Sequence, residues 1–230
     1  MLLLRTRSLK VVVSTSCAGQ ALRAYFDERA LGLFPYNRFC RGVLVLPEHH
    51  SEYLRGRRRQ ALRTNLRKAE AAGIRCEAIN SPADALDQIT EIEKYRRVRP
   101  VWAELPLPPY WRTVLAGQEV TVVIARDRLG RPLAAMAAVI DDSICLIRVA
   151  VASNHEARWA LHDHLVRALI GRGVKYLLVD GGGPFGALGC DTNVHHFQRL
   201  LGYELCHVKL APVVSSHPAE AQALAATARP

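Results

Sequence analysis

The sequence predicts an α/β fold, and three stretches carry that prediction. Residues 143–180 read as a strand, a helix with an N-terminal cap signal and a second strand, which is a right-handed β-α-β unit. Residues 120–140 read as two strands joined by a hairpin turn from Asp127 to Gly130. Residues 42–79 read as a strand, a long helix and another strand. Because strands and helices alternate in this way, we expect a mixed central sheet flanked by helices.

Apolar periodicity places the elements of the first half of the chain. Strands are expected at residues 9–14, 42–46 and 74–79, and helices at 20–31, 52–72 and 82–97. Gly73 ends the second of these helices, and Pro82 suits the first position of the third. Residues 99–109 are rich in proline and predict an irregular loop, followed by a short helix over 110–115.

The second half of the chain is organised around one further series of elements. Residues 143–152 are apolar and β-branched, and Ser153 with Glu156 forms a capping-box pattern at the start of a helix. The later elements expected are a strand at 176–180, a glycine run at 181–183, a helix at 193–201 closed by Gly202, and a strand at 203–210. A helix start gathers free backbone N–H groups and can hold a phosphate. The alternative is an ordinary β-α-β unit with an empty cap.

Composition bounds the class of protein. Half of the 230 residues are apolar, which suffices for a sizeable buried core. No apolar run approaches the length that spans a bilayer, and the six scattered cysteines form no CxxC pair, so we expect a cytoplasmic protein with reduced thiols. No spacing of cysteine and histidine matches a zinc site, so no metal is expected. The formal charge of +10 favours anionic partners without choosing among them.

The order of elements from residue 143 to 210 resembles the second half of the GNAT superfamily of N-acyltransferases. In that fold the fourth strand splays from the fifth, acyl-CoA lies in the gap, and its pyrophosphate rests on the loop that opens the next helix. The segment 193–204 (NVHHFQRLLGYE) looks like the closing helix and strand of the family. The resemblance implies cofactor-binding roles for Val149, Ala150, Val151, Ser153, Asn154, His155, Glu156, Ala157, Arg158, Asn193 and Phe197.

The loop and the closing helix depart from the family pattern at three positions. Ala160 and His162 occupy the positions where the family usually has glycine or a small residue. Gln198 stands where the family often has a tyrosine that acts as the acid.

Acyl transfer to an amine needs a base and donors that stabilise the oxyanion. The resemblance implies that backbone N–H groups near Val149 or Ala150 supply the donors. Asp180 ends a strand at the expected mouth of the site, although it could equally cap the glycine run. The candidate bases are Asp180, His155 and His196.

Substrate-binding side chains are expected in the proline-rich loop and on one strand. Trp102, Glu104, Tyr110 and Trp111 come from the loop side, where Glu104 could meet a positive charge and the aromatic residues could instead pack in the core or a lid. Arg148 interrupts an apolar strand, where a charge needs a partner such as Asp180, Asp141 or a ligand.

A row of arginines is expected along the helix predicted at 52–72. Its members recur at every fourth position, so they stack on one side of the helix: Arg55, Arg59, Arg63 and Arg67. The row is either a solvated face or a surface that contacts an anion, such as the adenosine phosphate of CoA, an acidic substrate or RNA.

The strand, basic helix and strand over 42–79 resemble a segment of Fem-type peptidyltransferases and related GNAT-like proteins. Together the two resemblances imply a GNAT-like acyltransferase domain at 42–210, after an extension at 1–41 and before a loose tail at 211–230, in a monomer or homodimer. The implied function is N-acyltransfer from acetyl-CoA or another acyl-CoA to a small-molecule or protein amine. The alternatives are a Fem-type transferase that uses aminoacyl-tRNA and a non-catalytic protein that binds nucleic acid or anionic surfaces.

Overall fold

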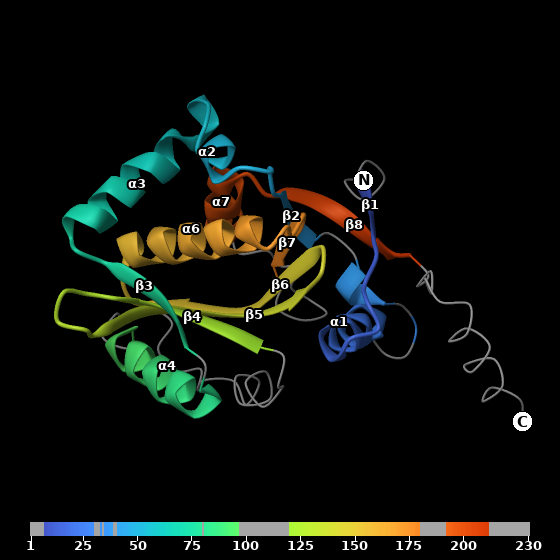
Figure 1. The fold of residues 1–230 in the computed structure, drawn as a ribbon, viewed down its shortest axis with the longest axis horizontal. Coiled ribbons are helices and arrows are strands. Elements are labelled where there is room, and N and C mark those ends of the chain that lie inside the picture. Colours follow the sequence, from blue (N-terminus) through green and yellow to red (C-terminus); the bar gives the residue numbers. More distant parts are fainter. Residues whose placement is uncertain are drawn as a thin grey trace, which may run out of the picture.

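The computed structural model describes residues 7–29, 33, 35–38, 41–79, 81–96, 120–179 and 192–211. Its strands form one eight-stranded sheet in the order β1-β8-β2-β7-β6-β5-β4-β3 (Figure 1). The strands are β1 (Arg7–Val11), β2 (Arg41–Val45), β3 (Arg75–Ile79), β4 (Val120–Arg126), β5 (Pro132–Asp141), β6 (Ile144–Ala152), β7 (Tyr176–Val179) and β8 (Glu204–Leu210). The helices are α1 (Cys17–Asp27), α2 (His50–Tyr53), α3 (Gln60–Ala71), α4 (Pro82–Arg96), α6 (His155–Gly171) and α7 (Thr192–Leu201), with 3-10 turns at Tyr36–Arg38 and Arg57–Arg59.

The sheet is mixed, and its pairings confirm the predicted β-α-β unit. Strands β3, β4, β5 and β6 pair in sequence as antiparallel neighbours, whereas β6 and β7 are parallel and are joined through α6. Strand β2 lies between β7 and β8 and is antiparallel to both, and β1 pairs in parallel with β8. Strand β1 therefore forms one edge of the sheet, and β2 lies inside it. The domain boundary near residue 42 stays a prediction.

Helices cover both faces of the sheet (Figure 1). Helix α6 lies on one face with α3 and α7 beside it, and α1 and α4 lie on the other. Leu161, Leu165 and Leu169 recur along α6 and are fully buried against the sheet. Removing each such side chain from water stabilises the fold by roughly 1.5–3 kcal/mol. Within the described residues, no helix combines the length and apolar character needed to cross a bilayer.

The single helix predicted at 52–72 is wrong, because the chain breaks at Gly56. Helix α2 ends at Tyr53, Gly56 has φ +87°, and a 3-10 turn leads into α3 at Gln60. A positive φ suits glycine and cannot continue a right-handed helix, so the chain changes direction there. The arginines at positions 55, 59, 63 and 67 therefore do not form one row on one helix.

The predicted capping box is also wrong by one residue. Asn154, not Ser153, caps α6, and its Oδ1 accepts a hydrogen bond from the N–H of Ala157 at 2.8 Å. Both the N–H and the hydroxyl of Ser153 donate to the carbonyl oxygen of Leu133, at 2.9 and 3.0 Å. Ser153 is thus held beside β5 as a continuation of β6, which moves the helix start to His155.

The remaining helices and strands predicted within the described residues are confirmed, with small shifts at the ends. The first helix begins at Cys17 rather than at residue 20, because the Ser16 hydroxyl accepts from the N–H of Gly19 and fixes the start there. Gly202 closes α7 with φ +85°, as expected. The proline-rich loop, the short helix at 110–115 and the glycine run lie outside the described residues.

Candidate functional site

Strands β6 and β7 pair over only part of their length. Their register runs from Ile144 opposite Tyr176 to Ile147 opposite Val179, where β7 ends. Strand β6 continues to Ala152 and keeps its pairing with β5. Among the described residues, the last part of β6 therefore has no partner on its β7 side, directly before the start of α6. In open α/β sheets, ligands bind at this end of parallel strands.

A β-bulge lies where the two strands part. Ala138 pairs with Ile147 and Ala137 pairs with Val149, so Arg148 is the extra residue of the bulge. A bulge redirects side chains and is frequent beside functional sites. The guanidinium of Arg148 lies over the ring of Tyr25 on α1, with its carbon 4.5 Å from the ring centroid.

Arg148 does not pair with Asp141, one of the partners considered from sequence. Asp141 instead accepts hydrogen bonds from the N–H of Ser14, at 2.8 Å, and from the hydroxyls of Ser14 and Ser16. The stacking on Tyr25 places Arg148 on the side of the sheet that α1 covers, where α1 packs against the end of β5 and the start of β6.

The backbone of residues 149–151 faces the region where β7 has ended. The side chains of Val149 and Val151 pack with the cluster under α4, whereas Ala150 is exposed. Contact with a ligand here would therefore come mainly from backbone N–H and C=O groups of this strand. The structure brings Val149, Ala150 and Val151 next to the start of α6, as the resemblance implies.

The first turn of α6 offers backbone donors to an anion. Asn154 already satisfies the N–H of Ala157, but no described group accepts from the N–H of His155 or Glu156. Free N–H groups and the positive end of a helix dipole favour negative charge.

Aromatic contacts connect this turn with α7. The guanidinium carbon of Arg158 lies 3.6 Å from the centroid of the Phe197 ring, and Trp159 meets the same ring edge-on at 4.8 Å. The structure thus brings Arg158 and Phe197 together, as the expected cofactor site requires. Asn193 lies in the first turn of the same helix.

One ring nitrogen of His155, a candidate base, is engaged within α6, and the role of this residue stays a prediction. The indole N–H of Trp159 can only donate a hydrogen bond, and it lies 3.0 Å from Nε2 of His155. Nε2 is therefore the acceptor, and its lone pair is occupied. His196 is exposed on α7, whereas Asp180, Trp102, Glu104, Tyr110 and Trp111 lie outside the described residues.

A buried polar cluster that sequence reasoning missed lies deeper, between α2, α6 and β8. Nε2 of His162 is 2.8 Å from the hydroxyl of Tyr203, and Nε2 of His50 is 2.8 Å from Oδ1 of Asp163. Burial, with Arg158 and Arg59 nearby, lowers the pKa of His162 to about 3, and burial raises the pKa of Tyr203 well above its usual value. The available signal was that His162 falls on the apolar side of α6, one turn from Trp159 and from Leu165.

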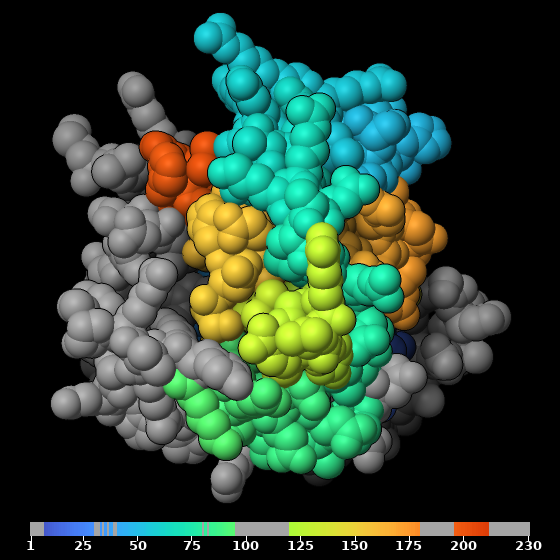
Figure 2. Space-filling view, turned by 90° about the vertical axis from the view of Figure 1, so that its left-hand side faces the viewer, coloured from blue at the N-terminus to red at the C-terminus, as the bar shows by residue number. Residues whose placement is uncertain are grey.

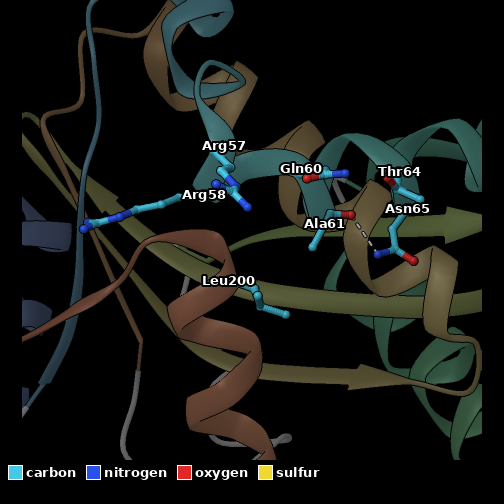
Figure 3. A pocket seen from close by; sticks show the side chains of 7 residues that line it. All are labelled: Arg57, Arg58, Gln60, Ala61, Thr64, Asn65 and Leu200. Carbon is cyan, nitrogen blue, oxygen red and sulfur yellow. Dashed lines mark hydrogen bonds between the residues drawn. The ribbon is translucent and has the colours of Figure 1, made fainter.

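Two hollows lie close to α7. One, of about 600 Å³, lies between α3 and α7 (Figure 3) and is lined by Arg57, Arg58, Gln60, Ala61, Thr64, Asn65 and Leu200. The other, of about 490 Å³, is lined by Gly42, Gln198, Arg199, Tyr203, Glu204 and Leu205. Neither is lined by residues of β6 or of the first turn of α6. Within the described residues, no cluster of three histidine, cysteine or acidic side chains could hold a metal ion.

At the level of sequence, no protein-family model and no curated protein matches the chain. The solved structures that are similar include FemX, with a TM-score of 0.53 and 11% identity, where the match covers 82% of this chain and 65% of that chain. L-PGS from Bacillus licheniformis is similar with a TM-score of 0.53 and 12% identity, over 73% of this chain and 57% of that chain. A conserved protein of unknown function from Bacteroides thetaiotaomicron VPI-5482 is similar with a TM-score of 0.55 and 12% identity, over 74% of this chain and 60% of that chain. The chain spans about three fifths of the length of these structures. At such identities the likeness shows the fold, which is GNAT-like, as predicted.

Proposed function

We propose that this protein is an N-acyltransferase that moves an acetyl or longer acyl group from acyl-CoA to an amine. The observation that carries the proposal is the parting of β6 from β7 directly before the start of α6. Among the described residues, this geometry brings together a strand edge without a partner, the N–H groups of His155 and Glu156 without an acceptor, and Arg158. An acyl-CoA has the matching chemistry, because its pantetheine arm is extended and its pyrophosphate is anionic.

Each part of the site has a role under this proposal. The N–H groups of His155 and Glu156 and the guanidinium of Arg158 hold the pyrophosphate. The backbone of residues 149–151 pairs with the extended part of the donor, and an N–H near Val149 or Ala150 stabilises the oxyanion.

The proton of the attacking ammonium goes to a base that sequence alone suggests. Asp180 follows the last residue of β7, and His196 is exposed on α7 beside Phe197. Once a base has taken the proton, the amine attacks the carbonyl, and collapse of the tetrahedral intermediate releases the thiol. Trp102, Glu104, Tyr110 and Trp111 remain proposed for the acceptor side, and the acceptor is a small-molecule or protein amine.

Isothermal titration with acetyl-CoA and with CoA tests the donor. Arg158→Ala should weaken binding by about 1.5–3 kcal/mol, the range for a hydrogen bond to a charged group. Arg167→Ala is the matched control, because Arg167 is exposed on a later turn of α6 and lies 3.5 Å from Asp163. A wild-type protein that binds neither compound at millimolar concentration would exclude the proposal.

A second candidate is transfer of an amino acid from aminoacyl-tRNA, as in Fem-type enzymes. One observation favours it: the basic surface around α3 carries arginines that pair with no described carboxylate, so they are available to phosphates. Transfer of a labelled amino acid from charged tRNA would support this candidate. Binding of RNA without any transfer would instead support a non-catalytic protein that binds nucleic acid or anionic surfaces.

A further inference from the structure

The basic residues from Arg55 to Lys68, in the turn after α2 and on α3, fall into two groups. Arg59 and Arg63 serve the fold: the guanidinium carbon of Arg59 lies 5.1 Å from the centroid of the Tyr53 ring, and Nη1 of Arg63 donates to the carbonyl oxygens of Leu54 and Gly56 at 2.6 and 2.9 Å. The other basic residues are exposed and have no carboxylate within ion-pair distance among the described residues. They are Arg55, Arg57, Arg58, Arg67 and Lys68.

Only two of these exposed arginines line the hollow between α3 and α7. Arg57 and Arg58 come from the 3-10 turn before α3, and Gln60, Thr64 and Asn65 add polar groups along the same side of α3. The first turn of α3 carries no acidic side chain, and Leu200 on α7 forms the opposite wall (Figure 3). The hollow of about 600 Å³ is therefore positive and polar on one side and apolar on the other.

This hollow lies close to the start of α6. Phe197, which stacks with Arg158, is one turn before Leu200 on α7, a rise of roughly 5 Å along the helix. Figure 2 shows the gold surface from the start of α6, the orange-red surface of α7 and the teal surface of α3 side by side on one face. A ligand whose pyrophosphate lies at α6 can therefore reach the hollow with a second phosphate.

We propose that the hollow between α3 and α7 binds the 3′-phosphate of the acyl-CoA donor. The inference rests on the proposed function and names a second anion site for it. A phosphate monoester carries nearly two negative charges at neutral pH, and the planar fork of arginine matches its oxygens. Arg57 extends from the 3-10 turn toward Leu200 and supplies one such fork, whereas Arg58 extends away from Gln60 and Thr64 and adds positive charge at the rim of the hollow (Figure 3). Gln60 and Thr64 supply neutral donors further along α3.

Dephospho-CoA, which lacks only the 3′-phosphate, isolates this contact. The wild-type protein should bind CoA at least about tenfold more tightly than dephospho-CoA, which corresponds to one charged hydrogen bond. Arg57→Gln with Arg58→Gln should abolish that preference and leave dephospho-CoA binding unchanged. The control is Arg55→Gln with Arg67→Gln, which removes the same charge from exposed residues outside the hollow and should retain the preference.

The other outcomes overturn the proposal. Equal affinity of the wild type for the two compounds, or an equal loss in both double variants, would mean that the hollow gives no specific contact. A fall in the affinity for a short single-stranded RNA only in the first variant, with the CoA preference unchanged, would make the hollow an RNA site. The proposed function is scored separately by acyl transfer. Acyl transfer without a preference for CoA over dephospho-CoA would refute only the phosphate site in the hollow. A preference for CoA without acyl transfer to any amine would refute the acyltransferase function and leave the phosphate site supported.

Discussion

The hydroxyl of Tyr203 lies 2.8 Å from Nε2 of His162, inside the core between α6 and the start of β8. Both side chains are buried, with exposed fractions of 6% and 2%. The other ring nitrogen of His162 has no hydrogen-bond partner among the described residues. A protonated imidazole would place an uncompensated charge there, so the folded protein holds His162 in its neutral form.

Acid should destabilise the protein through His162. Its pKa is about 3 in the folded state and about 6.5 in an unfolded chain, so the unfolded state binds the extra proton as the pH falls below 6.5. The free energy of unfolding should fall by about 1.4 kcal/mol per pH unit from there towards the folded pKa. Urea unfolding at pH 7.5, 6 and 5 measures it, with a loss of about 2 kcal/mol expected at pH 5.

The variant His162→Gln separates this contribution from those of the other histidines. Glutamine keeps a polar group for Tyr203 but does not titrate, so the difference between the wild type and the variant should shrink as the pH falls. A difference that stays constant between pH 7.5 and 5 would show that His162 does not carry the acid sensitivity.

Arg63 should stabilise the fold although it carries one of a series of like charges. Its guanidinium donates to the carbonyl oxygens of Leu54 and Gly56, which holds the turn that reverses the chain before α3. Arg63→Gln should lower the free energy of unfolding by about 1–2 kcal/mol, less than for a fully buried charged pair because the site is partly exposed. Arg67→Gln removes the same charge one turn later, where the side chain has no described partner, and should change stability by less than about 0.5 kcal/mol. Equal effects of the two changes would contradict the role of Arg63.

The turn at Gly56 also shows what the sequence could not settle. Apolar and basic residues on both sides of Gly56 continue a helical pattern, so periodicity alone favoured one helix over 52–72. Whether one glycine adopts a positive φ depends on contacts that form only in the folded chain, here those of Arg59 and Arg63. The row of arginines was an error of this kind, since it assumed one continuous helix.

Elements with a local signal and the β-α-β unit were predicted well, whereas the position of β2 in the sheet was not. The strand at 42–46 was expected from its apolar run, but nothing in it indicates that β2 lies between β7 and β8. In the candidate site, residues 149–158 come together because they are contiguous, and the resemblance supplied Phe197. The contact of Arg148 with Tyr25 was not predicted, because Tyr25 comes from α1, far away in sequence, whereas Asp180, another partner considered for Arg148, lies outside the described residues.

Phe197 should position Arg158 for donor binding. Phe197→Leu keeps an apolar side chain but removes the ring over which the guanidinium lies. Loss of a cation–π contact costs about 0.5–2 kcal/mol, so the Kd for acetyl-CoA should rise about two- to thirtyfold. The measurement is titration calorimetry at a temperature where both proteins are folded.

Phe26→Leu is the matched control for this change. Phe26 is fully buried on α1, on the opposite face of the sheet, so it makes the same chemical change away from α6. It should lower stability without altering the Kd. Equal Kd values for the wild type and Phe197→Leu would show that Arg158 does not need the ring to bind the donor.

Gly202 should tolerate a side chain less well than Gly173, although both end a helix with positive φ, at +85° and +75°. Placing alanine at such a φ costs about 1–2 kcal/mol by backbone strain alone. At Gly173 an added Cβ meets nothing within 4 Å, whereas at Gly202 it would lie 2.0 Å from the guanidinium of Arg59. The guanidinium can move, but it then leaves the ring of Tyr53 and loses a further stacking contact of about 0.5–1 kcal/mol.

Chemical unfolding should therefore give the highest free energy of unfolding for the wild type, a lower one for Gly173→Ala and the lowest for Gly202→Ala. In an Arg59→Gln background the two glycine variants should lose the same amount of unfolding free energy. A difference between them that persists there would assign the larger loss at Gly202 to the backbone rather than to Arg59.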